Sequence, residues 1–317
     1  MAETAASKTT GTGKRKKANR KVRIIAITAA ALCVLSALFP LFQDGWRVFY
    51  SMMGLSFPEE SGFSIHFLDV GSADAAVICC DGYTVLIDGG TYGTGIETYR
   101  YLRHMGVEEL DAMINTHPDS DHLGGFSEIL TRMPVKEYWE GEVPQELLPQ
   151  TEEYVLTRKA LKEKGVPIRT AVPGETLSFG KVQIQVLGPV KKGSDSNNNS
   201  LVLQVCYEGY TVLMMGDAGE EEEESLIEAG CSLQCDILKV GHHGSNTSTG
   251  RKLLKQAAPA YAVISVGKER GPGEKTLQRL EENNIQIYRT DTDGNIVLHI
   301  DGEGVTFTRE KDKEDSP

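Results

Sequence analysis

The chain has 317 residues, of which 40% are hydrophobic, and a formal net charge of −12 at pH 7. This acidic balance disfavours a high-affinity nucleic-acid groove or tight binding to anionic lipid, unless basic residues are concentrated locally. Six cysteines would allow disulfides in an exported chain, but three of them lie in expected strands, where buried thiols are an equally good interpretation.

The amino-terminal segment predicts a location. Residues 1–23 are basic, with eight Lys or Arg residues and a single Glu, whereas residues 24–42 carry no charge and are rich in Ile, Ala and Leu. A run of about 20 apolar residues can cross a bilayer as a helix, and the basic flank favours a cytoplasmic amino end. We therefore expect a single-pass signal anchor at 24–42 in the cell membrane, with the rest of the chain extracytoplasmic. A cleaved signal peptide and a buried soluble helix are the alternatives.

Beyond the anchor we expect a linker at 43–60, one domain at 61–308 and a disordered tail at 309–317. The tail contains no apolar residue, so it cannot bury a hydrophobic face.

The domain begins with strands, and Asp81-Gly82 between two of them is a typical hairpin turn. Helices are expected at 96–105 and over most of 127–165, and a strand, a hairpin at Asp293-Gly294 and a last strand close the domain. The other expected strands are 63–70, 75–80, 83–88, 110–115, 176–179, 182–187, 199–206, 210–215, 236–240 and 262–266. These strands form two series, each accompanied by helices, which predicts an α/β fold of two sheets packed face to face with helices outside.

Residues 115–125 hold the most informative motif, Asn-Thr-His-Pro-Asp-Ser-Asp-His-Leu-Gly-Gly. Two imidazoles and two carboxylates within six residues are ligand types for Zn²⁺, Mn²⁺ or Fe²⁺; they belong to His117, Asp119, Asp121 and His122. The motif lies between an expected strand and an expected helix, where α/β folds build their sites. The alternative is a polar turn whose histidines cap a helix or face solvent.

Asp217 and the pair His242-His243 each follow another expected strand. Each is weak evidence alone, because an Asp after a strand is more often a helix cap than a ligand. Together with the 117–122 cluster, they would complete one metal site from three remote segments. The glutamates at 220–224 are interpreted as a solvated first helical turn, favoured by the helix dipole, and not as a metal site.

Six short motifs are spread over about residues 62–302: Phe67-Leu-Asp-Val-Gly71, Leu86-Ile-Asp-Gly-Gly90, Thr116-His-Pro-Asp-Ser-Asp-His-Leu-Gly-Gly125, Asn199-Ser-Leu-Val-Leu203, Met215-Gly-Asp217 and Lys239-Val-Gly-His-His-Gly-Ser245. In these motifs the chain resembles the metallo-β-lactamase fold superfamily, and specifically the extracytoplasmic hydrolase domain of competence proteins of the ComEC/Rec2 type. The resemblance implies an αβ/βα four-layer sandwich with a metal site at one edge, and hydrolytic activity.

The resemblance also implies ligand roles. His117 and Asp119 would bind one ion, Asp121 and His122 would serve a second, and Asp217 would bridge the two. One histidine of the 242–243 pair would complete the first site, and His242 is slightly favoured over His243. A Gly-His-Pro motif usual in this branch is replaced by Arg270-Gly-Pro272, which removes an expected ligand and predicts a weaker second site.

The expected cofactor is a divalent metal, zinc or manganese, as one or two ions. Asp121 is the expected catalytic residue, because its carboxylate would orient a metal-activated water or take its proton. Four residues near the site could contact an anionic substrate group, or could only form hydrogen bonds within their loop: Lys239, Ser245, Thr247 and Ser248.

The predicted function is a membrane-anchored extracytoplasmic hydrolase of phosphodiesters. By resemblance, single-stranded DNA is one candidate substrate, whereas the net charge favours a small-molecule or wall-associated phosphodiester; the sequence indicates no protein partner. A lactamase, lactonase or thioesterase would use the same activated water and is the second enzyme hypothesis. A non-catalytic binding protein with a degraded metal site is the alternative from another class.

Overall fold

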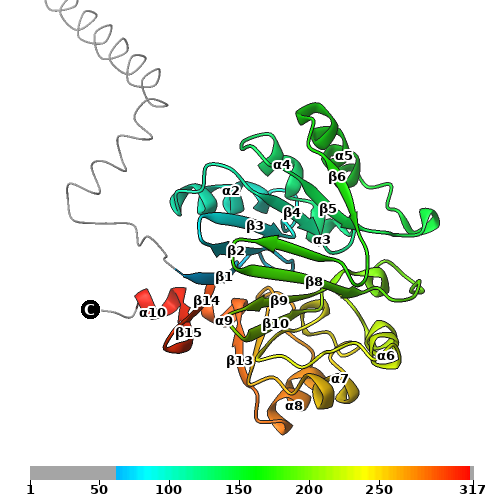
Figure 1. The fold of residues 1–317 in the computed structure, drawn as a ribbon, viewed down its shortest axis with the longest axis vertical. Coiled ribbons are helices and arrows are strands. Elements are labelled where there is room, and N and C mark those ends of the chain that lie inside the picture. Colours follow the sequence, from blue (N-terminus) through cyan, green and yellow to red (C-terminus); the bar gives the residue numbers. More distant parts are fainter. Residues whose placement is uncertain (1–61, 315–317) are drawn as a thin grey trace, which may run out of the picture. The chain divides into compact units, whose positions relative to one another are not determined.

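The structure, a computed structural model, describes residues 62–314 (Figure 1). The expected basic segment, signal anchor and linker (1–23, 24–42 and 43–60) lie outside this range. Within it, every helix is too short or too polar to cross a membrane. The five cysteines of the described part are free thiols.

Two sheets form the framework of the described residues. The first sheet contains β1 (Phe63–Phe67), β2 (Ala76–Cys80), β3 (Tyr83–Ile87), β4 (Ala112–Asn115), β5 (Tyr138–Gly141), β6 (Ile168–Ala171), β14 (Ile296–Asp301) and β15 (Gly304–Arg309), in the order β15-β14-β1-β2-β3-β4-β5-β6. The second contains β7 (Thr176–Phe179), β8 (Val182–Gly188), β9 (Val202–Tyr207), β10 (Tyr210–Met214), β11 (Ile237–Lys239), β12 (Tyr261–Ile264) and β13 (Gln286–Arg289), in the order β13-β12-β11-β10-β9-β8-β7.

Helices cover the outer faces of both sheets. Figure 1 shows α2 (Thr94–His104), α4 (Phe126–Leu130) and α5 (Glu152–Lys164) on one side, and α6 (Glu220–Glu228), α7 (Arg251–Ala257) and α8 (Glu274–Glu282) on the other. One apolar core lies between the sheets and a further core lies under each group of helices. The expected α/β architecture of two sheets with helices outside is therefore confirmed.

The predicted hairpin at Asp81-Gly82 joins β2 to β3, which pair antiparallel. Both turn residues have positive φ, 49° for Asp81 and 83° for Gly82. This is the backbone that a two-residue hairpin turn needs, and it explains why Asp-Gly is favoured there.

The expectation that 127–165 is largely helical is wrong in its middle. β5 lies between α4 and α5 and pairs parallel with β4 and with β6. Tyr138 and Trp139 of this strand are buried. A four-residue parallel strand has no room for an alternating pattern, and a short apolar run cannot be told from a helix segment by period alone.

The predicted hairpin at Asp293-Gly294 is also wrong. Asp293 ends the short helix α9 (Thr290–Asp293), and its carboxylate accepts a hydrogen bond from the Arg289 N–H (2.8 Å). The chain then crosses from the second sheet to the first, where β14 pairs with β1. The actual hairpin joins β14 to β15.

Order extends beyond the expected domain end at 308. β15 continues through Arg309, and α10 covers Glu310–Glu314, which corrects the expectation of a tail disordered from 309 onward. The Arg309 guanidinium pairs with Asp312 at 2.6 Å, and the Glu310 N–H donates to the Asn295 carbonyl at 2.9 Å. Ion pairs and backbone hydrogen bonds thus order a segment that has no apolar side chain.

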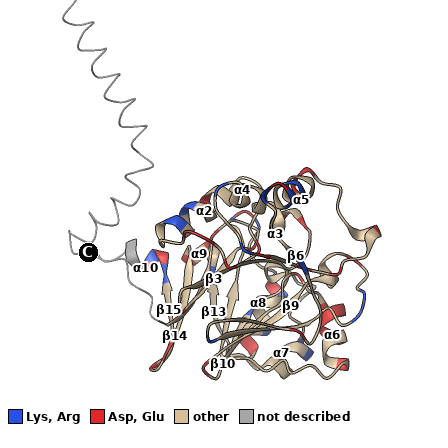
Figure 2. Ribbon diagram, turned by 45° about the horizontal axis from the view of Figure 1, so that its top comes forward, with Lys and Arg blue, Asp and Glu red and all other residues tan. Residues whose placement is uncertain are grey.

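The glutamate run begins α6 as expected, and Figure 2 shows this helix as strongly acidic. The run is not uniformly solvated, however, because Glu222 and Glu223 are buried. The Glu223 carboxylate accepts hydrogen bonds from the Thr249 N–H and the Gly250 N–H at the start of α7. Burial raises the pKa of both glutamates to about 7.

Replacing Glu223 with Gln is expected to change how stability depends on pH. With a folded-state pKa of about 7 against an ordinary value of 4.5, the folded protein keeps a proton that the unfolded chain has lost. The free energy of unfolding of the wild type therefore falls as pH rises from about 4.5 to about 7. Gln does not titrate, so the variant lacks this loss. Its free energy of unfolding relative to the wild type should therefore be about 2–3 kcal/mol more favourable at about pH 8 than at about pH 5.

Denaturant unfolding at the two pH values measures this difference. Glu224→Gln, on the exposed side of the same helix, is the control and should follow the wild type. The same pH dependence in Glu223→Gln and the wild type would contradict the raised pKa.

Candidate metal centre

The candidate ligands lie where strands of both sheets end. β4 leads into the 117–122 cluster, while β10 and β11, parallel neighbours in the second sheet, lead into Asp217 and into the 242–243 pair. The Leu201 N–H donates to the Thr116 carbonyl (2.8 Å) and ties the two sheets together beside these ends. Because carboxyl ends of parallel strands meet at one edge, the three remote segments converge.

Four side chains share one centre. The ligand atoms of Asp121, His122, Asp217 and His243 all lie within 4.8 Å of one another. Asp217 is central: its Oδ1 is 3.2 Å from Nε2 of His122 and its Oδ2 is 3.6 Å from Nε2 of His243. Asp217 is buried and does not cap α6, whose N-cap is Gly219. The helix-cap alternative is therefore excluded for this residue.

The donor atoms of this centre suit a metal ion. Nε2 of His117, His122 and His243 and Oδ1 of Asp217 are buried, and none has a hydrogen-bond partner within residues 62–314. Buried polar atoms are normally satisfied, because leaving them unpaired is unfavourable. Imidazole nitrogens with carboxylate oxygens are the donor set of zinc and related transition metals. The residues present therefore fit the divalent metal that the sequence predicts.

Electrostatics keeps the carboxylates of the centre ionised. Burial alone would raise the pKa of Asp217, but His122 and His243 hold it well below its usual range. For Asp121 the same two effects are opposed: burial raises the pKa, and the nearby imidazoles of His243 (3.4 Å away) and His122 bring it below the ordinary value. Both carboxylates are therefore ionised at neutral pH and would attract a cation.

His117 and Asp119 lie beside this group rather than within it. Nε2 of His117 is 3.7 Å from Oδ2 of Asp119, and the His117 ring centroid is 4.1 Å from that of His122. The Asp119 side chain is 37% exposed. These two residues could hold a further ion at the open side of the centre.

The sequence slightly favours His242 over His243 as the metal ligand, whereas the geometry favours His243. His243 has a side chain only 11% exposed and lies 3.4 Å from Asp121, whereas His242 is 30% exposed and approaches Asp217 only to 3.8 Å. Both histidines have positive φ, 49° and 51°, and Nδ1 of His243 is bonded to the Ser265 carbonyl at 3.0 Å. This turn directs the second ring inward.

His243 also alters the expected division of ligands. The sequence predicted a weak second site, because the replacement at 270–272 removes a ligand. In the structure, His243 lies in one group with Asp121, His122 and Asp217. His117 and Asp119 lie outside that group.

Asp88, at the end of β3, is a supporting residue that the sequence analysis did not assign. Its carboxylate accepts from Nδ1 of His122 (2.8 Å), from the Thr116 N–H (2.8 Å) and from the Thr116 hydroxyl (2.7 Å). In the neutral imidazole this contact places the hydrogen on Nδ1, so that Nε2 of His122 can act as a ligand atom toward the centre. The signal was present in Leu86-Ile-Asp-Gly-Gly90, another strand that ends in an aspartate.

Replacing Asp88 with Asn is expected to weaken metal binding by about 10- to 100-fold, because carboxylates that orient a histidine ligand contribute that much. Competition with a chromogenic chelator measures the affinity. Asp111→Asn is the control, since Asp111 also accepts from a backbone N–H, that of Thr84, but bonds Lys136 instead of a ligand. Equal affinity in Asp88→Asn and Asp111→Asn would contradict this role.

Lys239, expected near an anionic substrate, is instead buried below the centre. Its ammonium lies 2.9 Å from Oδ2 of Asp74, and both side chains are less than a tenth exposed. The pair joins β11 of the second sheet to the loop after β1. Ser248 donates to the Gly241 carbonyl (2.7 Å), and Ser245 bonds Thr247, so the loop-bonding alternative holds for these hydroxyls.

The family profile described as Metallo-beta-lactamase superfamily matches residues 68–268. The chain belongs to this superfamily. ComE operon protein 3 of Bacillus subtilis is 32% identical over 267 residues, which cover 77% of this chain and 34% of that protein. Competence protein ComA of Neisseria gonorrhoeae is 29% identical over 304 residues, covering 90% of this chain and 40% of that protein.

The chain therefore spans between a third and two fifths of the length of these curated relatives. Among solved structures, Igni18, a metallo hydrolase from the archaeon Ignicoccus hospitalis, has a TM-score of 0.51 and 15% sequence identity. The match covers 75% of this chain and all of that chain. At this identity the likeness shows the fold alone, which agrees with the two-sheet architecture.

Proposed function

We propose that the protein is a metal-dependent phosphodiester hydrolase. The observation that carries the proposal is the meeting of Asp121, His122, Asp217 and His243 around one centre, with buried nitrogen and oxygen atoms that no described residue satisfies. Membership of a superfamily of mostly metal-dependent hydrolases supports it. Zinc and manganese both suit the donor set.

A bound divalent ion would supply an activated water at neutral pH and would polarise the bond under attack. The chain's own residues divide the remaining work. His122 and Asp217 are buried and the His243 side chain is only 11% exposed, and these three would hold the ion in place. Asp121 has a side chain 36% exposed, so its carboxylate can face both the centre and an incoming substrate. One Asp121 oxygen faces His243, and the other would accept the proton from the attacking water.

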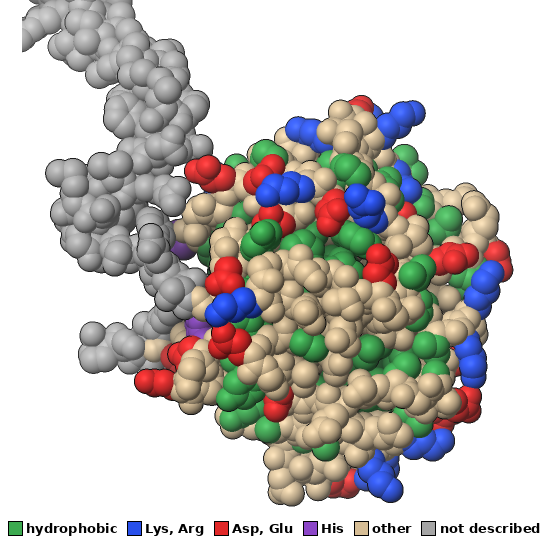
Figure 3. Space-filling view, viewed as in Figure 1, with side chains coloured by type: hydrophobic (Ala, Val, Ile, Leu, Met, Phe, Trp, Pro, Cys, Tyr) green, Lys and Arg blue, Asp and Glu red, His purple; other side chains and the backbone are tan. Residues whose placement is uncertain are grey.

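A phosphodiester is the substrate class that we propose. One of the relatives is named a competence protein, which supports single-stranded DNA as one candidate. The net charge of −12 and the face in Figure 3, where acidic side chains lie among the basic ones, favour a small substrate. Anchorage through residues 24–42, with the domain extracytoplasmic, belongs to the same proposal and is supported by the basic and apolar segments of the sequence.

Turnover of three substrates by the metal-loaded protein tests the proposal: bis(p-nitrophenyl) phosphate, single-stranded DNA and a chromogenic lactam. We expect phosphodiester hydrolysis that chelator abolishes and added metal restores. Turnover of the lactam alone would contradict phosphodiester hydrolysis and would favour the hydrolysis of carbonyl compounds instead. A protein that binds no transition metal, and whose stability chelator leaves unchanged, would be a binding protein instead.

A further inference from the structure

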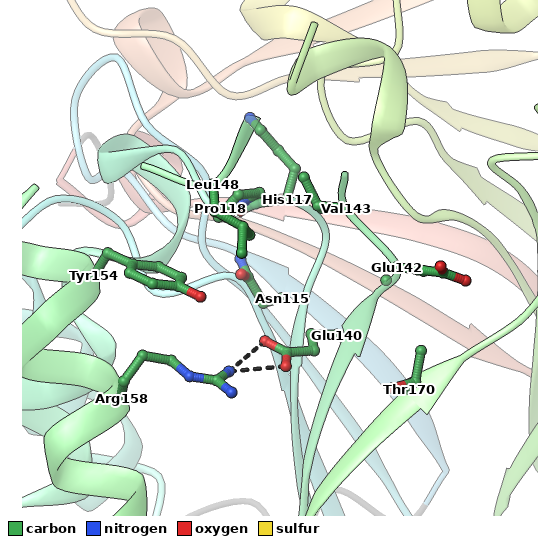
Figure 4. A pocket seen from close by; sticks show the side chains of 11 residues that line it. Asn115, His117, Pro118, Glu140, Glu142, Val143, Leu148, Tyr154, Arg158 and Thr170 are labelled. Carbon is green, nitrogen blue, oxygen red and sulfur yellow. Dashed lines mark hydrogen bonds and ion pairs between the residues drawn. The ribbon is translucent and has the colours of Figure 1, made fainter. Parts of the chain in front are cut away.

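A cavity of about 230 Å³ opens beside His117, next to the metal centre (Figure 4). Its walls come from the carboxyl ends of β4, β5 and β6 and from α5. This edge of a parallel sheet is where α/β proteins bind ligands. The volume is below the roughly 300–1,000 Å³ of complete ligand sites, so the cavity suits one ring-sized group of a larger substrate.

A charged pair forms part of the cavity wall. Nη1 of Arg158 donates to both carboxylate oxygens of Glu140, at 2.8 and 2.7 Å, and Figure 4 shows this contact facing the cavity. The Nε and Nη2 donors of Arg158 have no hydrogen-bond partner in the described part of the chain. Each Glu140 oxygen keeps a further lone pair. The pair therefore presents an acceptor and a donor side by side to whatever enters.

An aromatic ring forms another wall. Tyr154 of α5 is half-buried, and its hydroxyl end points into the cavity in Figure 4. Cζ of Arg158 lies 5.9 Å from the ring centroid. Val143 and Leu148, both half-buried, add apolar surface to the lining. A flat ring could stack here while its polar edge meets the charged pair.

The charge of the lining disfavours a second phosphate. Glu140 and Glu142 are opposed by Arg158 alone, and that guanidinium is already paired with a carboxylate. An anion would meet net negative charge, whereas an N–H donor would meet a carboxylate. The occupant that fits is flat, uncharged and able to donate a hydrogen bond.

We propose that this cavity is a subsite for a planar, uncharged heterocycle with an N–H donor next to an acceptor, as on the pairing edge of a nucleobase. The inference rests on the proposed function, because His117 would place the bound heterocycle beside a phosphodiester held at the metal centre. The subsite gives the site a preference for nucleoside phosphodiesters over simple alkyl ones.

Equilibrium dialysis of cytidine against the full-length protein in chelator tests the subsite without the metal. Cytidine carries no phosphate, so its binding reports the cavity alone. We expect saturable binding, weakened about tenfold or more for N4,N4-dimethylcytidine, which keeps the ring and loses the N–H donor. Tyr154→Leu should weaken cytidine binding by about 5- to 100-fold through lost stacking.

Tyr83→Leu is the matched control, since Tyr83 is 42% exposed and is not part of the cavity lining. Glu140→Gln should reduce the preference for cytidine over its dimethyl derivative, and it tests the proposal if Tyr154→Leu fails to fold. Absence of saturable cytidine binding, equal binding of both nucleosides, or equal effects of Tyr154→Leu and Tyr83→Leu would overturn it. Hydrolysis of bis(p-nitrophenyl) phosphate by the metal-loaded protein, assayed separately, shows whether the proposed function fails instead.

Discussion

Replacing Asp217 with Ala is expected to remove metal binding and hydrolysis together. Its Oδ1 lies 3.2 Å from His122 and its Oδ2 lies 3.6 Å from His243, so the substitution takes away the carboxylate that both imidazoles face. We expect phosphodiester turnover to fall by more than about 1000-fold, which corresponds to about 4 kcal/mol of transition-state stabilisation. Metal content after dialysis and turnover of bis(p-nitrophenyl) phosphate are the two measurements.

Asp301→Asn provides the control, because Asp301 is exposed at the end of β14 and only accepts from backbone N–H groups of the hairpin. That variant should keep its metal and its activity. If Asp217→Ala retains a full complement of metal and wild-type turnover, the centre described here is not the site of the reaction.

Replacing Lys239 with Met is expected to lower the free energy of unfolding by about 3–5 kcal/mol, because it leaves the Asp74 carboxylate buried without its partner. Burial raises the pKa of Asp74, and Lys239 brings it below its ordinary value. Without Lys239 the group is either an unpaired buried anion or takes up a proton, and both outcomes cost free energy of folding. Denaturant unfolding in chelator measures the loss without a contribution from metal binding.

The double variant Asp74→Asn/Lys239→Met should recover much of that loss, since it removes both charges. Lys252→Met serves as a matched control: Lys252 pairs with Glu224 at 2.6 Å, but both side chains are more than half exposed, and such pairs contribute about 1 kcal/mol or less. A Lys239→Met protein as stable as Lys252→Met would show that the buried pair does not contribute to the free energy of unfolding.

The sequence predicted the parts of the fold that leave a local pattern. Strands such as β7 and β8 alternate or end at glycine, and motifs at strand ends located the three segments of the centre. β5 and β6 were not predicted, because short parallel strands pair with residues far along the chain. The burial of Glu222 and Glu223 was missed for a related reason, since the Glu223 carboxylate contacts the start of α7 and that of Glu222 contacts the Val190 N–H after β8.

Within the centre, the residue types were predictable and their arrangement was not. Spacing placed both histidines of the 242–243 pair near the other ligands, but the turn conformation selects His243. Asp88 contacts His122 across 34 positions, and nothing in its own segment indicates that partner. The identity of ligands is thus local information, whereas their orientation comes from the tertiary structure.

The pairing of β1 with β14 has a consequence for biogenesis. Phe63 lies opposite Ile300, so β1 cannot pair with β14 until nearly the entire domain has been synthesised. Until then its outer edge offers unpaired backbone groups to other chains, a known route to aggregation. Products truncated ahead of residue 296 should therefore be found in insoluble material, even though every residue of the metal centre is present in them.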